Sequence, residues 1–155
     1  METNQEKNHV QVAEIQLSYK TKVKPSERPK INSSKDAYNI LLQTWDDDKI
    51  EFVEQFKVLL INRANHVLGI VAISTGGMTG TVADPKIIFA SALKANACSL
   101  ILAHNHPSGN RQPSQADIDL SRKVREGGKL LEIQVLDHII VTTEGYTSLS
   151  DEGLM

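Results

Sequence analysis

The strongest hydrophobic signal in the chain is the short apolar run Ser-Leu-Ile-Leu-Ala over residues 99–103. A run of this length without a polar face is typical of a central strand that is buried on both faces of a sheet. Four further strands are predicted over residues 54–62, 66–74, 134–141 and 146–149. The first two of these flank the turn-forming residues 62–65, so we expect an antiparallel hairpin there.

Helical patterns alternate with these strands, and each predicted helix opens with residues that favour a helix start. The three helices span residues 33–45 with Ser33 or Ser34 as the N-cap, residues 84–97 with Asp84 as the N-cap, and residues 113–126, ended by Gly127-Gly128. The second helix is apolar on most faces, so we expect it to be largely buried. The alternation predicts an α/β domain with a mixed β-sheet and flanking helices.

The first thirty residues have a different pattern. Residues 1–12 are polar and read as a flexible tail, whereas residues 13–24 alternate between apolar and charged positions. That period of two predicts a half-exposed edge strand, which Pro25 and Pro29 end. We therefore divide the chain into a tail with an edge strand, residues 1–30, and one domain, residues 31–155.

Composition narrows the class of protein. The chain has 155 residues, of which 40% are hydrophobic, and a formal net charge of -2. This charge gives no general cationic field for nucleic acids. Residues 20–35 hold six basic residues against one acid, but no aromatic residues are interleaved to stack on bases, so a solvated linker is favoured over a nucleic-acid contact.

The single cysteine, Cys98, excludes an intramolecular disulfide and a cysteine zinc cage. No apolar run approaches the roughly 20 residues that span a bilayer, so no membrane partner is expected. The N-terminus has no apolar signal-peptide core. A cytoplasmic location is the resulting expectation.

Candidate chemistry follows the central apolar run directly. His104 and His106 are two positions apart, so in an extended segment their side chains point to the same face and can reach one ion. Asp117 can add an oxygen ligand if the loop folds back. Two histidines and one carboxylate leave a fourth position for water, as in a catalytic zinc site. The spacing Ser114-x-x-Asp117 also fits a helix-capping pattern, which is compatible with a ligand role for Asp117.

These residues carry a family resemblance. His104-x-His106, seven residues, Ser114, two residues and Asp117 resemble the JAMM motif of JAB/MPN metalloproteases. The longer wording HNHPSGN, together with Asp-His-Ile-Ile at residues 137–140, resembles the RadC family in particular. The resemblance implies a cytidine-deaminase-like JAB/MPN fold over residues 31–155 and a zinc-dependent hydrolase of peptide or isopeptide bonds. It also implies an association with DNA repair and with DNA-processing proteins.

The same resemblance implies the remaining site residues. The family's general base lies two residues before a phenylalanine that opens a strand, a position filled here by Glu54, with Glu51 as the fallback. The Ser114 hydroxyl would stabilise the oxyanion. Asp137 or His138 would support the ligands, although strand-end hydrogen bonds explain them equally well. The glycine-rich residues 76–80 are expected to border the site.

Three other functions compete with this interpretation. The letters His-Asn-His suggest an HNH nuclease, but the residues of that motif are spread along a ββα element. Deaminase chemistry needs a His-x-Glu and Pro-Cys-x-x-Cys set that this sequence lacks. The third competitor is a catalytically idle metal-binding module that works with DNA-processing partners. The family's association with DNA repair and its protease-like site point to different functions, which keeps this module open. The family's helical DNA-associated segment has no counterpart in the first thirty residues, which argues against the family's DNA association for this chain.

Overall fold

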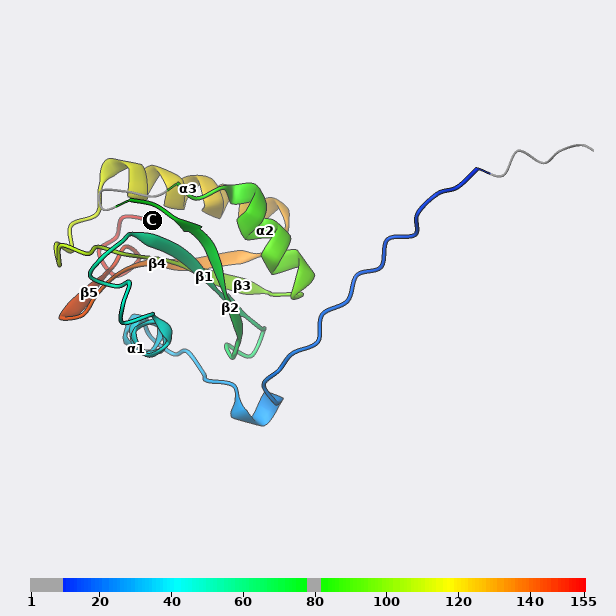
Figure 1. The fold of residues 1–155 in the computed structure, drawn as a ribbon, viewed down its shortest axis with the longest axis horizontal. Helices are drawn as coiled ribbons and strands as arrows, with labels where there is room; N and C mark the ends of the chain where they lie inside the picture. Colours follow the sequence, from blue (N-terminus) through cyan, green and yellow to red (C-terminus); the bar gives the residue numbers. More distant parts are fainter. Residues whose placement is uncertain (1–9, 78–81) are drawn as a thin grey trace, which may run out of the picture.

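The computed structural model describes residues 10–77 and 82–155, which form a five-stranded mixed sheet between two layers of helices (Figure 1). The strands lie in the order β2-β1-β3-β4-β5. Strand β1 is antiparallel to β2 and β3, β3 is parallel to β4, and β5 is antiparallel to β4. The strands are β1 Gln55–Ile61, β2 Val67–Thr75, β3 Ser99–Asn105, β4 Gln134–Thr142 and β5 Gly145–Ser148. The predicted α/β fold with a mixed sheet is confirmed.

Helix α1 covers one face of the sheet, and α2 and α3 cover the other (Figure 1). A short 3-10 helix, η1 Pro25–Glu27, precedes them. The helices are α1 Ser34–Thr44, α2 Pro85–Lys94 and α3 Gln115–Leu130. Two apolar clusters fill the space between these layers, one on the α1 face and one on the face of α2 and α3. Within the described residues, no helix is long and apolar enough to cross a membrane.

Strand β3 is the centre of the sheet, and all seven of its residues are buried. Successive side chains of a strand alternate between the two faces. Leu102 therefore joins the cluster under α2 and α3, and Ala103 joins the cluster under α1. The same alternation sends His104 to the α3 face and Asn105 to the α1 face, at the end of the strand where the apolar residues stop.

A β-bulge in β4 decides which polar residue of that strand faces α3. Leu100 pairs with Val135, but the next residue, Ile101, pairs with Asp137, so β4 contains one extra residue at this point. Such an insertion re-aims the side chains that follow it. As a result, His138 pairs with Leu102 and faces α3, whereas Asp137 faces the side of α1.

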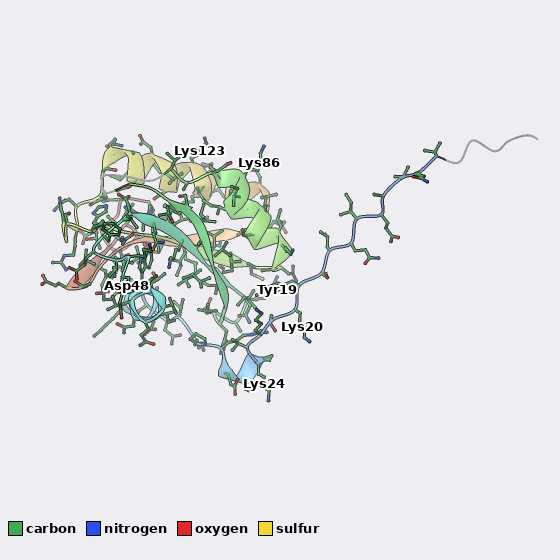
Figure 2. All side chains as sticks on the ribbon, in the orientation of Figure 1. Tyr19, Lys20, Lys24, Asp48, Lys86 and Lys123 are labelled. Atoms are coloured by element: carbon green, nitrogen blue, oxygen red, sulfur yellow. The ribbon has the colours of Figure 1, made fainter. Side chains whose placement is uncertain are left out.

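The predicted edge strand over residues 13–24 is not present, because no strand lies beside these residues. A lone extended segment has no neighbour to complete its backbone hydrogen bonds, so the alternating pattern alone does not make a strand. Its apolar side chains are solvated, with Leu17 88% exposed. Figure 2 shows the segment leaving the domain near Tyr19. Residues 1–9 of the predicted tail lie outside the described residues, as do residues 78–80 of the glycine-rich loop.

Helix α2 is also less buried than predicted, and it ends at Lys94. Only Ile88 and Ala92 are buried in it, while Ile87 and Leu93 are about half exposed. The helix packs over the edge of the sheet, where β2 lies, so its outer side has no second layer to cover it.

Helix α3 does not end at Gly127-Gly128 but continues to Leu130. Gly128 is required for a close approach rather than for a helix end. A Cβ atom at this position would lie 2.3 Å from the backbone oxygen of Ile133, in the connection that leads into β4.

Replacing Gly128 with alanine should therefore lower the free energy of unfolding by about 1–3 kcal/mol, the usual cost of overpacking. Gly127→Ala is the matched control, because its Cβ would meet only the ring of Phe89, at 2.9 Å. That ring can move aside, and the higher helix propensity of alanine offsets about 1 kcal/mol of the cost of this contact. Urea unfolding of the two variants measures the difference, and a Gly128→Ala protein as stable as Gly127→Ala would contradict the close-approach explanation.

Candidate metal centre

The two histidines of the motif meet at the end of β3. The Nε2 atoms of His104 and His106 lie 2.9 Å apart. His104 is 1% exposed, and its ring lies parallel to that of Phe56 in β1, with 6.0 Å between centroids. The predicted convergence of the two imidazoles is therefore present in the structure.

A tight turn orients His106. Gly109 has a φ of 80°, a conformation that glycine adopts without steric cost, and its N–H donates to the carbonyl of His106 at 3.0 Å. The turn brings the carbonyl of Asn110 to Nδ1 of His106, at 2.5 Å. A carbonyl only accepts, so Nδ1 carries the proton and Nε2 presents its lone pair to His104.

Asp117 reaches the site from the first turn of α3. Ser114 is the N-cap, and the two residues form a capping box: the Asp117 N–H donates to Ser114 Oγ at 3.1 Å, and the Ser114 N–H donates to Asp117 Oδ2 at 2.8 Å. The other carboxylate oxygen, Oδ1, lies 3.5 Å from His104 Nε2. The cap thus holds one oxygen of Asp117 and leaves the other facing the histidines.

The environment favours the charged form of Asp117. Burial by itself raises the pKa of this carboxyl, but the hydrogen bond and charge of a protonated His104 and the hydrogen bonds from Ser114 outweigh it. The net result is a pKa well below the usual range of an aspartate. Asp117 is therefore an anion at neutral pH, as a cation ligand must be.

Glu54 is the upstream acid that joins the cluster. Its Oε1 lies 3.9 Å from His104 Nε2, and ligand atoms of Glu54, His104 and His106 all lie within 4.8 Å of one another. Asp117 is outside this tightest group, although it is closer than Glu54 to His104. Glu51, the fallback, is exposed and lines a hollow beside His106 instead.

Asn105, between the two histidines, holds the segment that carries Glu54. Its side chain is fully buried on the α1 face, where Nδ2 donates to the carbonyls of Ile50 and Val53, each at 2.8 Å. Its Oδ1 accepts from the N–H of Gln55 at 2.7 Å. Glu54 is further fixed by backbone hydrogen bonds with Gly76 and Gly77. One strand end therefore positions both histidines and the acid opposite them.

Asn105→Ala should release this segment, because three backbone groups lose their partner at a buried position. Each unpaired buried group costs about 1–3 kcal/mol. We therefore expect the segment that contains these groups to open to water, because water can replace the lost partner. Hydrogen exchange of the Gln55 amide should become much faster. Asn62→Ala is the control, since Asn62 Oδ1 accepts two backbone bonds in the distant β1–β2 turn. Equal protection of the Gln55 amide in both variants would contradict the role of Asn105.

His138 and Asp137 have separate environments. His138 Nε2 lies 2.7 Å from His104 Nδ1, on the side of His104 away from the site. Burial chiefly, and then the positive charges that His104 and His106 carry when protonated, hold the pKa of His138 well below its usual value against the opposing effect of Asp117. Asp137 instead accepts from Ser148, from Ser150 and from the N–H of His138 itself. Only His138 contacts a site residue, so Asp137 is a structural residue of the strand end.

The site residues together fit a metal ion. Two imidazole Nε2 atoms and two carboxylate oxygens converge from β3, from the segment before β1 and from the start of α3. The close pair of imidazole nitrogens is stable only with a cation or a proton between them, because His106 Nε2 directs a lone pair at His104. The arrangement can therefore hold a metal ion and place a carboxylate beside it.

The mixed five-stranded sheet with three helices is consistent with a JAB/MPN domain. Within that class, the sequence profile of the RadC-like JAB domain family matches residues 31–154. The chain therefore belongs to the RadC-like JAB domain family.

Curated relatives from bacteria and archaea agree with this assignment. A UPF0758 protein of Flavobacterium johnsoniae is 41% identical over 125 residues, which is 81% of this chain and 53% of that protein. UPF0758 proteins of Desulfitobacterium hafniense and Methanosarcina mazei are each 38% identical, over 84% and 93% of this chain and 56% and 61% of their own lengths. The chain thus spans little more than half the length of these relatives.

Sequence reasoning missed two residues of the site's surroundings, Asn105 and Ser121. The position of Asn105 was visible in the sequence, because a polar residue between two ligands on a buried strand must point to the opposite face and find partners there. Ser121 follows Asp117 by four residues and so lies on the same side of α3. A serine in a helix interior is common, so this spacing is a weak signal.

Proposed function

We propose that this domain is a zinc-dependent hydrolase of amide bonds, acting on a peptide or isopeptide substrate. The convergence of Glu54 with the Nε2 atoms of His104 and His106 carries the proposal, because it joins a metal-ligand pair to a carboxylate with no helix-capping task. Membership of the RadC-like JAB domain family supports the same chemistry.

In this proposal, His104, His106 and Asp117 hold the zinc ion. Two nitrogens and one carboxylate oxygen are a ligand set that zinc prefers, and it leaves a position open. When bound, zinc would polarise the scissile carbonyl and lower the pKa of a coordinated water to about 7. The remaining steps belong to side chains of this chain.

Glu54 is the general base. Its carboxylate accepts a proton from the attacking water and delivers it to the leaving amine, so that one water and one amide yield a carboxylate and an amine. Ser114 assists the carbonyl oxygen. Its capping bond uses a lone pair of the hydroxyl and not its proton, which remains available to an oxyanion.

We expect one zinc ion per chain, and we expect zinc at a hundredfold excess over its Kd to add about 2.7 kcal/mol to the free energy of unfolding. His104→Ala should abolish this stabilisation. His66→Ala is the matched control, because His66 Nδ1 contacts the carbonyl of Arg28 at the far end of β2. Chemical unfolding with and without zinc measures both. Stabilisation that survives in His104→Ala would place the zinc elsewhere.

Glu54→Gln should keep its zinc and lose amide hydrolysis by about 10²- to 10⁴-fold, the usual contribution of a general base. Glu51→Gln is the control, because that side chain is also acidic and near His106 but outside the cluster. The measurement is hydrolysis of a broad panel of peptides and isopeptides, with metal content determined in parallel.

The outcomes separate the candidate functions. Full activity in Glu54→Gln would remove Glu54 as the base, and a loss confined to Glu51→Gln would transfer the role to Glu51. Zinc binding without hydrolysis of any substrate by the wild type would favour the idle metal-binding module.

That module, acting with DNA or DNA-processing proteins, is the second candidate function. Exposed lysines on the extended N-terminal segment favour it, including Lys20 and Lys24, which project from the domain in Figure 2. Filter binding to DNA at two salt concentrations is the direct test. Phosphate contacts give an affinity that falls steeply with salt, and the absence of any binding at low salt would exclude a direct DNA contact.

A further inference from the structure

A chain of buried polar contacts leads from α3 to the site, and the proposed reaction does not use it. It begins at Ser121 in α3, passes through His138 in β4 and ends at His104. Ser121 and His138 have no exposed surface. Ser121 Oγ lies 2.7 Å from the carbonyl oxygen of Asp117 and 2.6 Å from His138 Nδ1. His138 Nε2 lies 2.7 Å from His104 Nδ1.

When both rings are neutral, only one arrangement of protons satisfies all three contacts. The carbonyl of Asp117 can only accept, so the Ser121 hydroxyl donates its single proton there. Ser121 Oγ must then accept from His138, which places the His138 proton on Nδ1 and leaves Nε2 with a lone pair. That lone pair accepts from His104, so the His104 proton is on Nδ1. Three contacts and three protons match with none left over.

This series of contacts ends at the His104 ring, whose other nitrogen, Nε2, faces His106, Asp117 and Glu54. We propose that Ser121 and His138 are positioning residues that keep a proton on His104 Nδ1, so that Nε2 is the atom left to bind a metal ion. The consequence for metal affinity rests on the proposed zinc function, whereas the proton arrangement itself does not.

The packing around these three side chains supports this role. Phe56 lies parallel to His104 and edge-on to His138, with 5.5 Å between the centroids of Phe56 and His138. The β4 bulge directs His138 toward α3. Ser121 also bonds the backbone of Asp117, so a single hydroxyl connects the first turn of α3 with the ring of His138, which contacts His104.

The first experiment reads the protons directly in the metal-free wild type. Two-bond ¹⁵N–¹H correlation spectra of histidine rings distinguish a proton on Nδ1 from one on Nε2. We expect His104 and His138 both to carry the proton on Nδ1. An Nδ1 atom without a proton in either ring would overturn the proposal, whatever any variant does.

The second experiment removes the Ser121 hydroxyl, with which the series of contacts begins. In Ser121→Ala, His138 Nδ1 loses its acceptor, so the proton is expected to move to His138 Nε2 and displace the His104 proton toward the site. The zinc Kd, measured by competition with a chromophoric chelator, should weaken about 10- to 100-fold, as is typical when a supporting partner of a ligand is removed. Ser121→Thr, which retains a hydroxyl, should restore the wild-type tautomers and most of the affinity.

Ser91→Ala is the matched control, because Ser91 makes the same bond to the preceding helical turn, to Ile87 at 2.9 Å, in α2 rather than α3. Weakening of zinc binding by the same factor in both alanine variants would show an effect on helix stability and overturn the proposal, as would an unchanged Kd in Ser121→Ala. If the wild type has the expected tautomers but binds no zinc, the proposed proton arrangement is supported and the zinc function is contradicted. If zinc binds and the tautomers differ, only the proposed proton arrangement is contradicted.

Discussion

The structure depends on burying polar side chains at the end of an apolar strand. His104 and Asn105 are enclosed almost completely, although the five residues before them are a continuous buried core. A buried polar atom without a partner costs about 1–3 kcal/mol, so each nitrogen and oxygen of these side chains needs a neighbour with the right donor or acceptor. Those neighbours come from β4, from the segment before β1 and from the loop into α3. The end of one strand therefore specifies where three other segments lie.

The convergence of the candidate ligand residues was predictable from local rules. The i, i+2 spacing placed His104 and His106 on one face, because β3 is extended to its last residue. The Ser114-x-x-Asp117 spacing predicted a capped helix start, and the cap itself fixes which carboxylate oxygen faces the histidines. Glu54 was different, since no local pattern connects it to residues fifty positions later. Only the family resemblance pointed to it, and the antiparallel pairing of β1 with β3 explains why it lies there.

The features that sequence reasoning missed depend on contacts distant in the chain. The residue pattern over 134–141 does not predict a bulge. The sequence therefore left open whether Asp137 or His138 is the partner of His104. The pair Gly127-Gly128 resembles a helix end, but the constraint is the carbonyl of Ile133. The alternating residues 13–24 have the pattern of a strand and lack a neighbouring strand, which their own sequence cannot reveal.

The capping box at the start of α3 has a thermodynamic consequence. Asp117 uses one oxygen to close the first turn of the helix and directs the other at the histidines, so the two tasks share a single side-chain conformation. If Asp117 is a ligand, as proposed, an ion held at the site and the closed first turn are linked equilibria. By reciprocity, the free energy with which the ion tightens that turn equals the free energy with which a closed turn strengthens ion binding. In the proposed metal site, the stability of the start of α3 would then depend on whether an ion is bound, and would in turn affect how tightly the ion binds.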